Sequence, residues 1–368
     1  MVMHRWDEVL FAQSTSNAPI KNTASAEYRE GLYPAFSATG QDVWLPTHRY
    51  EGRGIVVSAV GARCGKSFKA DGKWSVVANT HALYVNEDIA LRDYCWYALN
   101  NEEWWIKAGS GQPFVKLKDS LKRKHCFPPI EEQKQIVKVL DEVAQLISLR
   151  KEQLAKLDQL VKSRFIELFG DVIQNDRGWE QYTFSDIATS RLGKMLDAKQ
   201  QTGKYAYPYL ANFNVQWFRF EIDNLNKMDF NEADRQEFEL RDGDLLVCEG
   251  GEIGRCAVWH NEIQPCYFQK ALHRVRCNQR IVLPDYMAWW LKYNCDHKGF
   301  AAIEGAKATI AHLPGAKLKA LKITVPPIEL QNQFVAFIKQ TDKSKLAIQQ
   351  SLDKLELLKK SLMQEYFG

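Results

Sequence analysis

Two stretches of the chain carry the same long pattern of apolar and polar positions. Residues 127–170 and 325–368 align without a gap at an offset of 198 residues, with 16 identities in 44 positions. Unrelated segments would share roughly three identities, so the repeat is real. Between the Pro-Pro-Ile-Glu that opens each copy and the Phe-Gly that closes it there is no further Gly or Pro. Each copy therefore predicts one uninterrupted helix, roughly 60 Å long at 1.5 Å per residue.

Within each copy the apolar residues recur at alternating steps of three and four, the spacing of a coiled-coil seam. The predicted seam residues are Leu140, Ile147, Leu154 and Leu157 in the first copy and Ile338, Ile348, Leu352 and Leu355 in the second. Four basic residues interrupt the seam, namely Arg150, Arg164, Lys345 and Lys359. Long basic side chains can lay their stems along a seam while the charge stays in water, so we interpret these as register devices or contact points for another helix. The alternative is two separate amphipathic helices, each packed on its own domain.

The segments that precede the two helices also resemble each other. The opening around Trp6 compares with that around Trp179, and the Gly-bounded apolar runs at 52–72 and 240–259 indicate strands and tight turns. We predict an α+β fold, in which two α/β domains of one type are separated by two long helices that form an antiparallel coiled coil, a pseudo-twofold internal repeat. The predicted boundaries are 1–126 for the first domain, 127–171 for the first helix, 172–324 for the second domain and 325–368 for the second helix.

Charge restricts where a nucleic acid could bind. The net charge is only +4 over 368 residues, so a nucleic-acid surface must be local. The stretches 104–130 and 305–328, which lead into the helices, hold six and four basic residues against the single acid Asp119. The sequence has no apolar run of 18 residues, no signal peptide and no zinc-spaced cysteines, so we expect a cytoplasmic protein with reduced thiols and no membrane partner.

Motifs for chemistry are incomplete. The segment Gly61–Ser67 resembles a phosphate-binding loop but has three residues, not four, before Gly-Lys-Ser. The Pro-Pro pairs follow Phe127 and Val325, which cannot hold a target amine as an amino-methyltransferase site must. The acids of 242–252 lack the Glu-x-Lys that a nuclease would need. We therefore predict that the chain is not an enzyme and holds neither a catalytic nor a metal site.

The gapless helical repeat, opened twice by Pro-Pro-Ile-Glu-x-Gln-x-Gln and preceded twice by a diverged domain, resembles the specificity subunit of type I restriction-modification systems. Three further stretches resemble its target-recognition domains: YPAFSATG at 33–40 with ARCGKSF at 62–68, YLANFNVQ at 209–216, and LRDGDLLV at 240–247. The resemblance covers essentially the whole chain.

This resemblance implies a DNA-binding subunit without catalytic activity. Each target-recognition domain would read half of a bipartite, asymmetric site in double-stranded DNA, with the helices as a ruler for the unread spacer. Two methyltransferase subunits would methylate adenine with S-adenosylmethionine, and motor-nuclease restriction subunits would cleave with ATP and Mg. These cofactors would belong to the partners.

Candidate DNA contacts follow from residue chemistry. Short hydroxyl and amide side chains in glycine turns can reach base edges, and Arg commonly reads guanine. The predicted base-reading residues are Ser37, Thr39, Gly40, Arg63, Lys66, Asn79 and His81 in the first domain, and Asn212, Asn214 and Gln216 in the second, where alternation would place all three on one face of a strand. The predicted phosphate contacts are Arg255, Lys270 and Lys307. The alternative roles are turn caps in the first domain and a polar outer sheet face in the second.

Three other functions stay open at this point. The chain could be the specificity subunit of a type II system, in which another subunit carries both methylation and cleavage. It could be a coiled-coil scaffold without specific DNA binding. A nucleotide hydrolase is the third possibility, and its activity would depend on Lys66.

Overall fold

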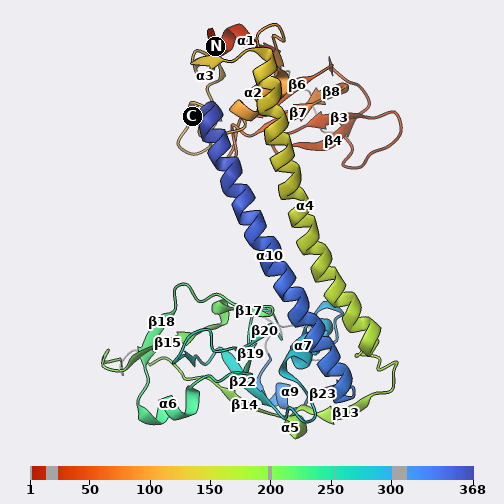
Figure 1. Ribbon diagram of the computed structural model, residues 1–368, viewed down its shortest axis with the longest axis vertical. Helices are drawn as coiled ribbons and strands as arrows, with labels where there is room; N and C mark the ends of the chain where they lie inside the picture. The colour runs from red at the N-terminus through yellow and green to blue at the C-terminus, as the bar shows by residue number, and fades with distance from the viewer. Residues whose placement is uncertain (1, 14–23, 198–200, 253, 301–312) are drawn as a thin grey trace. The chain divides into compact units, whose positions relative to one another are not determined.

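The computed structural model describes residues 2–13, 24–197, 201–252, 254–300 and 313–368. The chain packs as two compact units. The first contains the residues up to Glu152 together with Gln349–Gly368, and the second contains Gln153–Ile348. Each unit therefore combines one mixed α/β domain with a segment of each of two long helices, which confirms the predicted fold class (Figure 1).

The two predicted long helices are confirmed. Helix α4 spans Ile130–Phe169 and helix α10 spans Ile328–Phe367, 40 residues each. A proline pair stands directly before each helix, where the fixed φ suits helix entry and the missing N–H would have no helical partner. Gly170, with a φ of +71°, ends α4 in the left-handed conformation, and its N–H lies 2.8 Å from the carbonyl oxygen of Ile166.

Within each unit the two helices run antiparallel and pack on each other. In the first unit, Leu140 belongs to a buried cluster against which Leu362 and Tyr366 pack, and Lys151 Nζ lies 2.8 Å from a carboxylate oxygen of Glu356. In the second unit, the rings of Phe165 and Phe334 lie 5.4 Å apart in the shared core. These contacts between helices rule out two separate amphipathic helices.

All eight predicted seam residues point inward. Leu140 and Leu352 are buried, and the other six are half-buried: Ile147, Leu154, Leu157, Ile338, Ile348 and Leu355. The four basic residues that interrupt the seam are also half-buried, namely Arg150, Arg164, Lys345 and Lys359. The seam therefore continues through these positions, with the basic side chains lying along it.

The first domain has two four-stranded sheets, in the strand orders β2-β9-β6-β7 and β4-β3-β8-β5. The first sheet is antiparallel throughout, and β3 and β8 form a parallel pair in the second. The strands are β1 (Val2–Arg5), β2 (Leu10–Gln13), β3 (Tyr33–Phe36), β4 (Gln41–Leu45), β5 (Tyr50–Glu51), β6 (Gly54–Ser58), β7 (Ser67–Ala70), β8 (Lys73–Val76), β9 (Thr80–Val85), β10 (Lys107–Ala108), β11 (Phe114–Val115) and β12 (Lys124–Phe127). The helices are α1 (Trp6–Val9), α2 (Arg92–Leu99) and α3 (Leu117–Leu121).

The second domain repeats this plan with the orders β14-β22-β19-β20 and β18-β15-β21. Its strands are β13 (Glu180–Thr183), β14 (Ala188–Leu192), β15 (Ala206–Leu210), β16 (Val215–Gln216), β17 (Arg219–Phe220), β18 (Asn226–Asp229), β19 (Leu245–Cys248), β20 (Cys256–Val258), β21 (Tyr267–Phe268), β22 (Leu272–Cys277) and β23 (Lys322–Val325). Its helices are α5 (Phe184–Ile187), η2 (Asn212–Asn214, a 3-10 turn), α6 (Glu232–Phe238), α7 (Pro284–Asp296) and α9 (Gly315–Lys319). In both domains, one two-stranded sheet (β1-β12 or β13-β23) leads directly into the long helix.

Matching backbone hydrogen bonds within each domain show which residues of the two domains are equivalent. The N–H of Trp6 bonds to the carbonyl of Arg123 at 3.0 Å, and the N–H of Phe184 bonds to the carbonyl of Leu321 at 2.8 Å. Both aromatic side chains are buried. Phe184, not Trp179, is therefore the counterpart of Trp6, and the comparison made from sequence is wrong. The Trp179 indole instead donates to the carbonyl oxygen of Phe169 at the end of α4, at 2.8 Å.

None of the helices within the described ranges is both long and apolar enough to cross a lipid bilayer.

Candidate functional site

Part of the predicted base-reading set of the first domain and the whole set of the second follow equivalent strands of the repeated domain. The turn Ser37–Gly40 follows β3, and the segment Asn212–Gln216 follows β15. Strands β3 and β15 correspond because each pairs antiparallel with the strand that comes next in its sheet and parallel with a later one. Each domain thus has a group of candidate residues at the same connection, although only Thr39 among them is exposed.

In the first domain, Asp42 organises this turn. The hydroxyls of Ser37 and Thr39 lie 2.7 Å apart and both bond to the same carboxylate oxygen of Asp42, that of Ser37 at 2.5 Å. Gly40 adopts a φ of +140°, and a side chain there would meet the ring of Phe68 at 3.3 Å. The hydroxyls therefore act as turn caps in this structure, and reading of bases by them stays a prediction.

Of the other predicted residues of the first domain, Lys66 lies beside this turn. Lys66 Nζ lies 5.2 Å from the centre of the Phe68 ring, the ring that faces Gly40. His81 pairs across the sheet with Val57, next to the Lys66 end of β7. Asn79 is exposed, has a φ of +65°, and bonds through its carbonyl to the N–H of Ala59.

Arg63 lies in the turn between β6 and β7. Its guanidinium is 3.4 Å from a carboxylate oxygen of Glu102, and two thirds of its side chain is exposed. Because the segment Gly61–Ser67 joins two antiparallel strands, no helix follows it. A phosphate-binding loop of the nucleotide-hydrolase type ends at a helix N-terminus, so the geometry excludes that function for this segment.

The second domain contradicts the predicted strand at Asn212–Gln216. Asn212–Asn214 form a 3-10 turn, and only Gln216 and its neighbour Val215 lie in a strand. Asn214 is buried: its carbonyl oxygen accepts from the N–H of Ala211 and its amide donates to the carbonyl of Glu221, each at 2.9 Å. Base reading by Asn214 is therefore ruled out in this conformation, because its side chain closes the turn from inside. Asn212 and Gln216 are half-buried and stay candidates.

Two of the predicted phosphate contacts lie near the end of β15. Arg255 Nη2 donates to the carbonyl of Asn212 at 3.1 Å. Lys270 is exposed, and its neighbour Gln269 bonds through its N–H to the carbonyl of Leu210 at 2.9 Å. Arg255 is also the counterpart of Lys66, because their carbonyls accept equivalent bonds from Cys248 and Ser58. Lys307 lies outside the described residues.

Two histidines occupy matching places in the repeat, which the sequence comparison missed. His81 pairs with Val57 on β6, and His273 pairs with Val247 on β19. Burial lowers the pKa of both imidazoles. His273 is 2% exposed and its Nε2 lies 3.2 Å from the carbonyl oxygen of Leu313. The shared Thr/Leu-His-Ala/Arg-Leu/Val pattern at 80–83 and 272–275 is the signal that could have found the pair.

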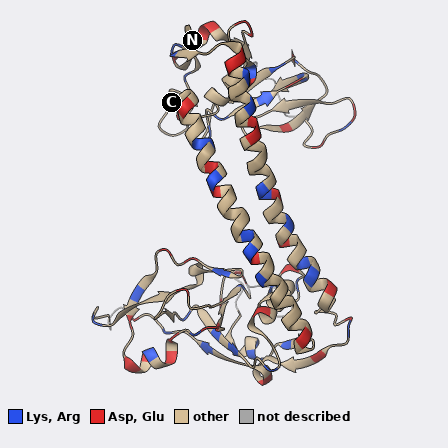
Figure 2. Ribbon diagram, in the orientation of Figure 1, with Lys and Arg blue, Asp and Glu red and all other residues tan. Residues whose placement is uncertain are grey.

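Charged residues of both signs alternate along α4 and α10, without long blocks of one sign (Figure 2). The basic stretches before the helices are partly engaged with the protein. Lys122 pairs with Asp119 at 3.1 Å, Arg123 lies 5.3 Å from the centre of the Trp104 indole, and Lys322 donates to the Thr183 hydroxyl at 2.8 Å. These three side chains thus have structural partners.

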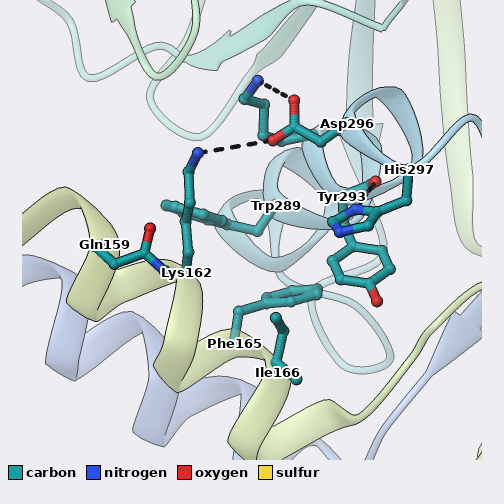
Figure 3. Close-up of a pocket in the computed structure, with 9 residues that line it drawn as sticks. Gln159, Lys162, Phe165, Ile166, Trp289, Tyr293, Asp296 and His297 are labelled. Carbon is teal, nitrogen blue, oxygen red and sulfur yellow. Dashed lines mark hydrogen bonds and ion pairs between the residues drawn. The ribbon is translucent and has the colours of Figure 1, made fainter. Parts of the chain in front are cut away.

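A hollow of about 300 Å³ opens between α4 and α7 in the second unit. Figure 3 shows Phe165, Trp289 and Tyr293 along its wall, with Asp296 held by ion pairs to Lys162 and Lys292. On the same wall, the rings of Tyr293 and His297 stack with their centres 4.1 Å apart. Among the described residues, no group of three or more His, Cys, Asp or Glu side chains is placed to hold a metal ion.

Comparison with known proteins gives a consistent result. The family model described as type I restriction modification DNA specificity domain matches residues 47–159 and again residues 176–358. A Haemophilus influenzae protein, provisionally named a type I restriction enzyme specificity subunit, is 23% identical over 97% of this chain and 94% of its own length. The MjaVIII specificity subunit of a type I restriction enzyme from Methanocaldococcus jannaschii is 28% identical over 39% of this chain and 35% of its own.

Solved structures show the same fold. The crystal structure of the S subunit of a type I restriction-modification system from M. genitalium covers 100% of this chain and 96% of its own, with a TM-score of 0.62 at 14% identity. A chain from a study of complex assembly and conformational transition in a type I restriction-modification system covers 100% and 97%, with a TM-score of 0.60 at 14% identity.

Proposed function

The chain belongs to the family of type I restriction modification DNA specificity domains, and from this we propose that it is the DNA-recognition subunit of a restriction-modification complex, without catalytic activity of its own. The observation that carries the proposal is the repeat of one domain, with a group of candidate residues after the equivalent strands β3 and β15. Because one chain carries two copies of the domain, each copy can bind one half of a DNA site that has two halves. Because the copies differ in sequence, the recognised site is bipartite and asymmetric.

Contacts to bases come, in this proposal, from the connections after β3 and β15. Thr39 is exposed and Gln216 is half-buried at these connections, and amide side chains can bond bidentately to adenine. Lys66 and Arg255 occupy matching positions beside them, so we propose that Lys66, which the sequence predicted to read a base, contacts a DNA phosphate as Arg255 does. Base contacts would then specify the sequence, and phosphate contacts would position each domain.

The long helices offer a surface for partner subunits. Large apolar residues on them lie outside the seam and are more than two fifths exposed: Leu146, Leu149 and Leu160 on α4, and Leu346, Leu357 and Leu358 on α10. We propose that two methyltransferase subunits dock there and that motor-nuclease subunits join the complex in the cytoplasm. In this proposal, S-adenosylmethionine, ATP and Mg are bound by those partners.

A selection experiment tests the proposal. The chain, purified in complex with its methyltransferase, is offered random duplex DNA at about 0.15 M salt, where sequence-blind phosphate binding is weak. The expected result is enrichment of two short motifs separated by a fixed unread gap. A scaffold without specific DNA binding would enrich nothing, and its weak binding at low salt would vanish as salt rises.

A further inference from the structure

Gln133, in the first turn of α4, is fully buried and uses its whole side-chain amide. The carbonyl oxygen accepts from the N–H of Leu91 at 2.8 Å. The amide nitrogen donates to the carbonyls of Ile89 at 3.0 Å and Pro128 at 2.8 Å. Leu91 and Ile89 belong to the connection between β9 and α2, so one side chain ties the start of the long helix to the interior of the first domain.

Gln331 makes the same three bonds in the second unit. Its carbonyl oxygen accepts from the N–H of Leu283 at 2.8 Å, and its nitrogen donates to the carbonyls of Ile281 at 2.9 Å and Pro326 at 2.8 Å. It is also fully buried. Leu283 and Leu91 are the residues that cap α7 and α2. The two glutamines, 198 residues apart, are therefore equivalent clamps between a helix and its domain.

Packing and hydrogen bonds both act at these joints, since Ile136, Leu140 and Phe334 lie in buried cores shared by a long helix and its domain, but each joint has one open side. A hollow of about 290 Å³ lies beside the first, lined by Ile89, Phe127 and the Pro128–Pro129 pair among others. A hollow of about 320 Å³ lies beside the second, lined by Ile281, Val325 and Pro326–Pro327 among others. Because each joint is open on this side, side-chain contacts there do not oppose a swing of the domain on its helix. The buried hydrogen bonds of the glutamine do oppose it, since a swing would leave their partners unsatisfied.

We propose that Gln133 and Gln331 are positioning residues that set the angle of each domain on its helix, and so determine which spacer length the protein accepts between the two half-sites. This inference rests on the proposed function. Adjacent base pairs are about 3.4 Å apart along DNA. A domain whose reading surface moves by that distance would reach a half-site one base pair nearer or farther. With the glutamine hydrogen bonds in place, the protein would reject sites whose spacer differs by one base pair. Without these bonds, it would accept them.

Gln133→Met and Gln331→Met test this inference, because methionine has a similar length and none of the three hydrogen bonds. The probes are duplexes that carry the two half-sites found for the unchanged protein, with the natural spacer or a spacer one base pair shorter or longer. The unchanged complex is expected to prefer its natural spacer by at least about 100-fold, since a misplaced half-site loses its base contacts. Each methionine variant is expected to reduce that preference by about tenfold, while binding to the natural spacer changes less.

Two further variants complete the design. Gln133→Glu and Gln331→Glu place a carboxyl beside two carbonyl oxygens in a buried site, where burial favours its protonated form. That form accepts from the leucine N–H and donates once, so two of the three bonds return and most of the spacer preference is expected to return with them. Gln145→Leu and Gln340→Leu, at exposed positions on the same helices, are the matched controls and are expected to keep the full preference.

The outcomes separate the two proposals. If the unchanged complex selects no bipartite site, the proposed function fails. If it does select one, and folded methionine variants keep the full spacer preference, the positioning role is overturned. If neither the methionine nor the glutamate variants fold, as judged by thermal unfolding, the glutamines serve folding and the positioning role is rejected.

Discussion

Lys345 on α10 and Asp158 on α4 form an ion pair, with 2.7 Å between the lysine Nζ and a carboxylate oxygen. Lys345 occupies a seam position and is about a quarter exposed, whereas about two thirds of the Asp158 side chain is exposed. The lysine stem thus fills the seam while its charge reaches an acid at the rim. This arrangement explains how a basic residue can stand in the seam without breaking it.

Replacement of Lys345 by methionine is expected to leave stability unchanged or to raise it. The carboxylate of the pair is largely exposed, so the ion pair contributes little, and an apolar stem of similar length suits the half-buried seam position better. We expect the midpoint of thermal unfolding to rise by up to about 3 °C. Lys343→Met, at an exposed position two residues earlier, is the control and should shift it by less. A clear fall for Lys345→Met alone would show that the ion pair is a net stabiliser.

Asn214 and Gln216, two residues apart, are expected to respond in opposite ways to alanine. Asn214→Ala leaves the N–H of Ala211 and the carbonyl of Glu221 without their partner, so we expect a loss of about 1–3 kcal/mol in the free energy of unfolding. Gln216→Ala should change stability by less than about 0.5 kcal/mol.

Recognition should separate these two variants further. Gln216→Ala is expected to weaken binding at one half-site about tenfold or more, the size of one lost base contact, and to leave the other half-site unchanged. Binding is measured on duplexes that carry either half-site mutated. Equal weakening at both half-sites would contradict the assignment of this connection to one half-site.

Stability should fall as the solution becomes acidic. Burial lowers the pKa of His273 below its ordinary value of 6.5, so the unfolded chain takes up the proton first as pH falls. The folded state therefore loses stability from about pH 6.5 downward, until the pH reaches the lowered pKa. Burial lowers the pKa of His81 and His125 as well, and they act in the same direction. His273→Gln should make the decline between pH 7 and pH 5 shallower, as followed by thermal unfolding. An unchanged slope would exclude His273 as a contributor.

Lengthening both helices by one heptad tests the role of the helices as a ruler. Seven residues inserted into each of α4 and α10 would preserve the three-four spacing of the seam and lengthen each helix by about 10 Å. We expect the accepted spacer to lengthen by about three base pairs, at 3.4 Å each. Selection of sites from random DNA measures the spacer, and a spacer that stays the same would contradict the ruler. A five-residue insertion, which breaks the seam spacing, is the control and should destabilise the chain.

The long helices could be predicted in full from the sequence because their signal is redundant. Forty residues without Gly or Pro, a proline pair in front and a regular seam all specify the same element. The regular spacing of the seam also showed, from the sequence alone, that four basic residues occupy seam positions. The repeat of the Pro-Pro-Ile-Glu-x-Gln opening was also visible, but the hydrogen bonds that tie Gln133 and Gln331 to their domains were not, because two of the three partners of each glutamine lie more than 40 residues away in sequence.

The domains were harder to predict because each prediction about them rested on only one or a few residues. The alternation of Asn212, Asn214 and Gln216 fits a strand, but the Asn214 side chain bonds to the backbone on both sides and stabilises a turn instead. Trp179 attracted the comparison with Trp6 because both are tryptophans. Its indole binds the end of α4, whereas Phe184 fills the equivalent core position. A single aromatic residue is not enough to align the sequences of two diverged domains. The strand pairing is needed as well.

The most direct test of the central claim is to co-express the chain with the methyltransferase encoded beside it and to map methyladenine across the host genome by single-molecule sequencing. The expected result is one bipartite, asymmetric motif with a gap of fixed length, methylated only when this chain is present. An absence of new methylation from a stable complex, or methylation at a single continuous motif, would contradict it.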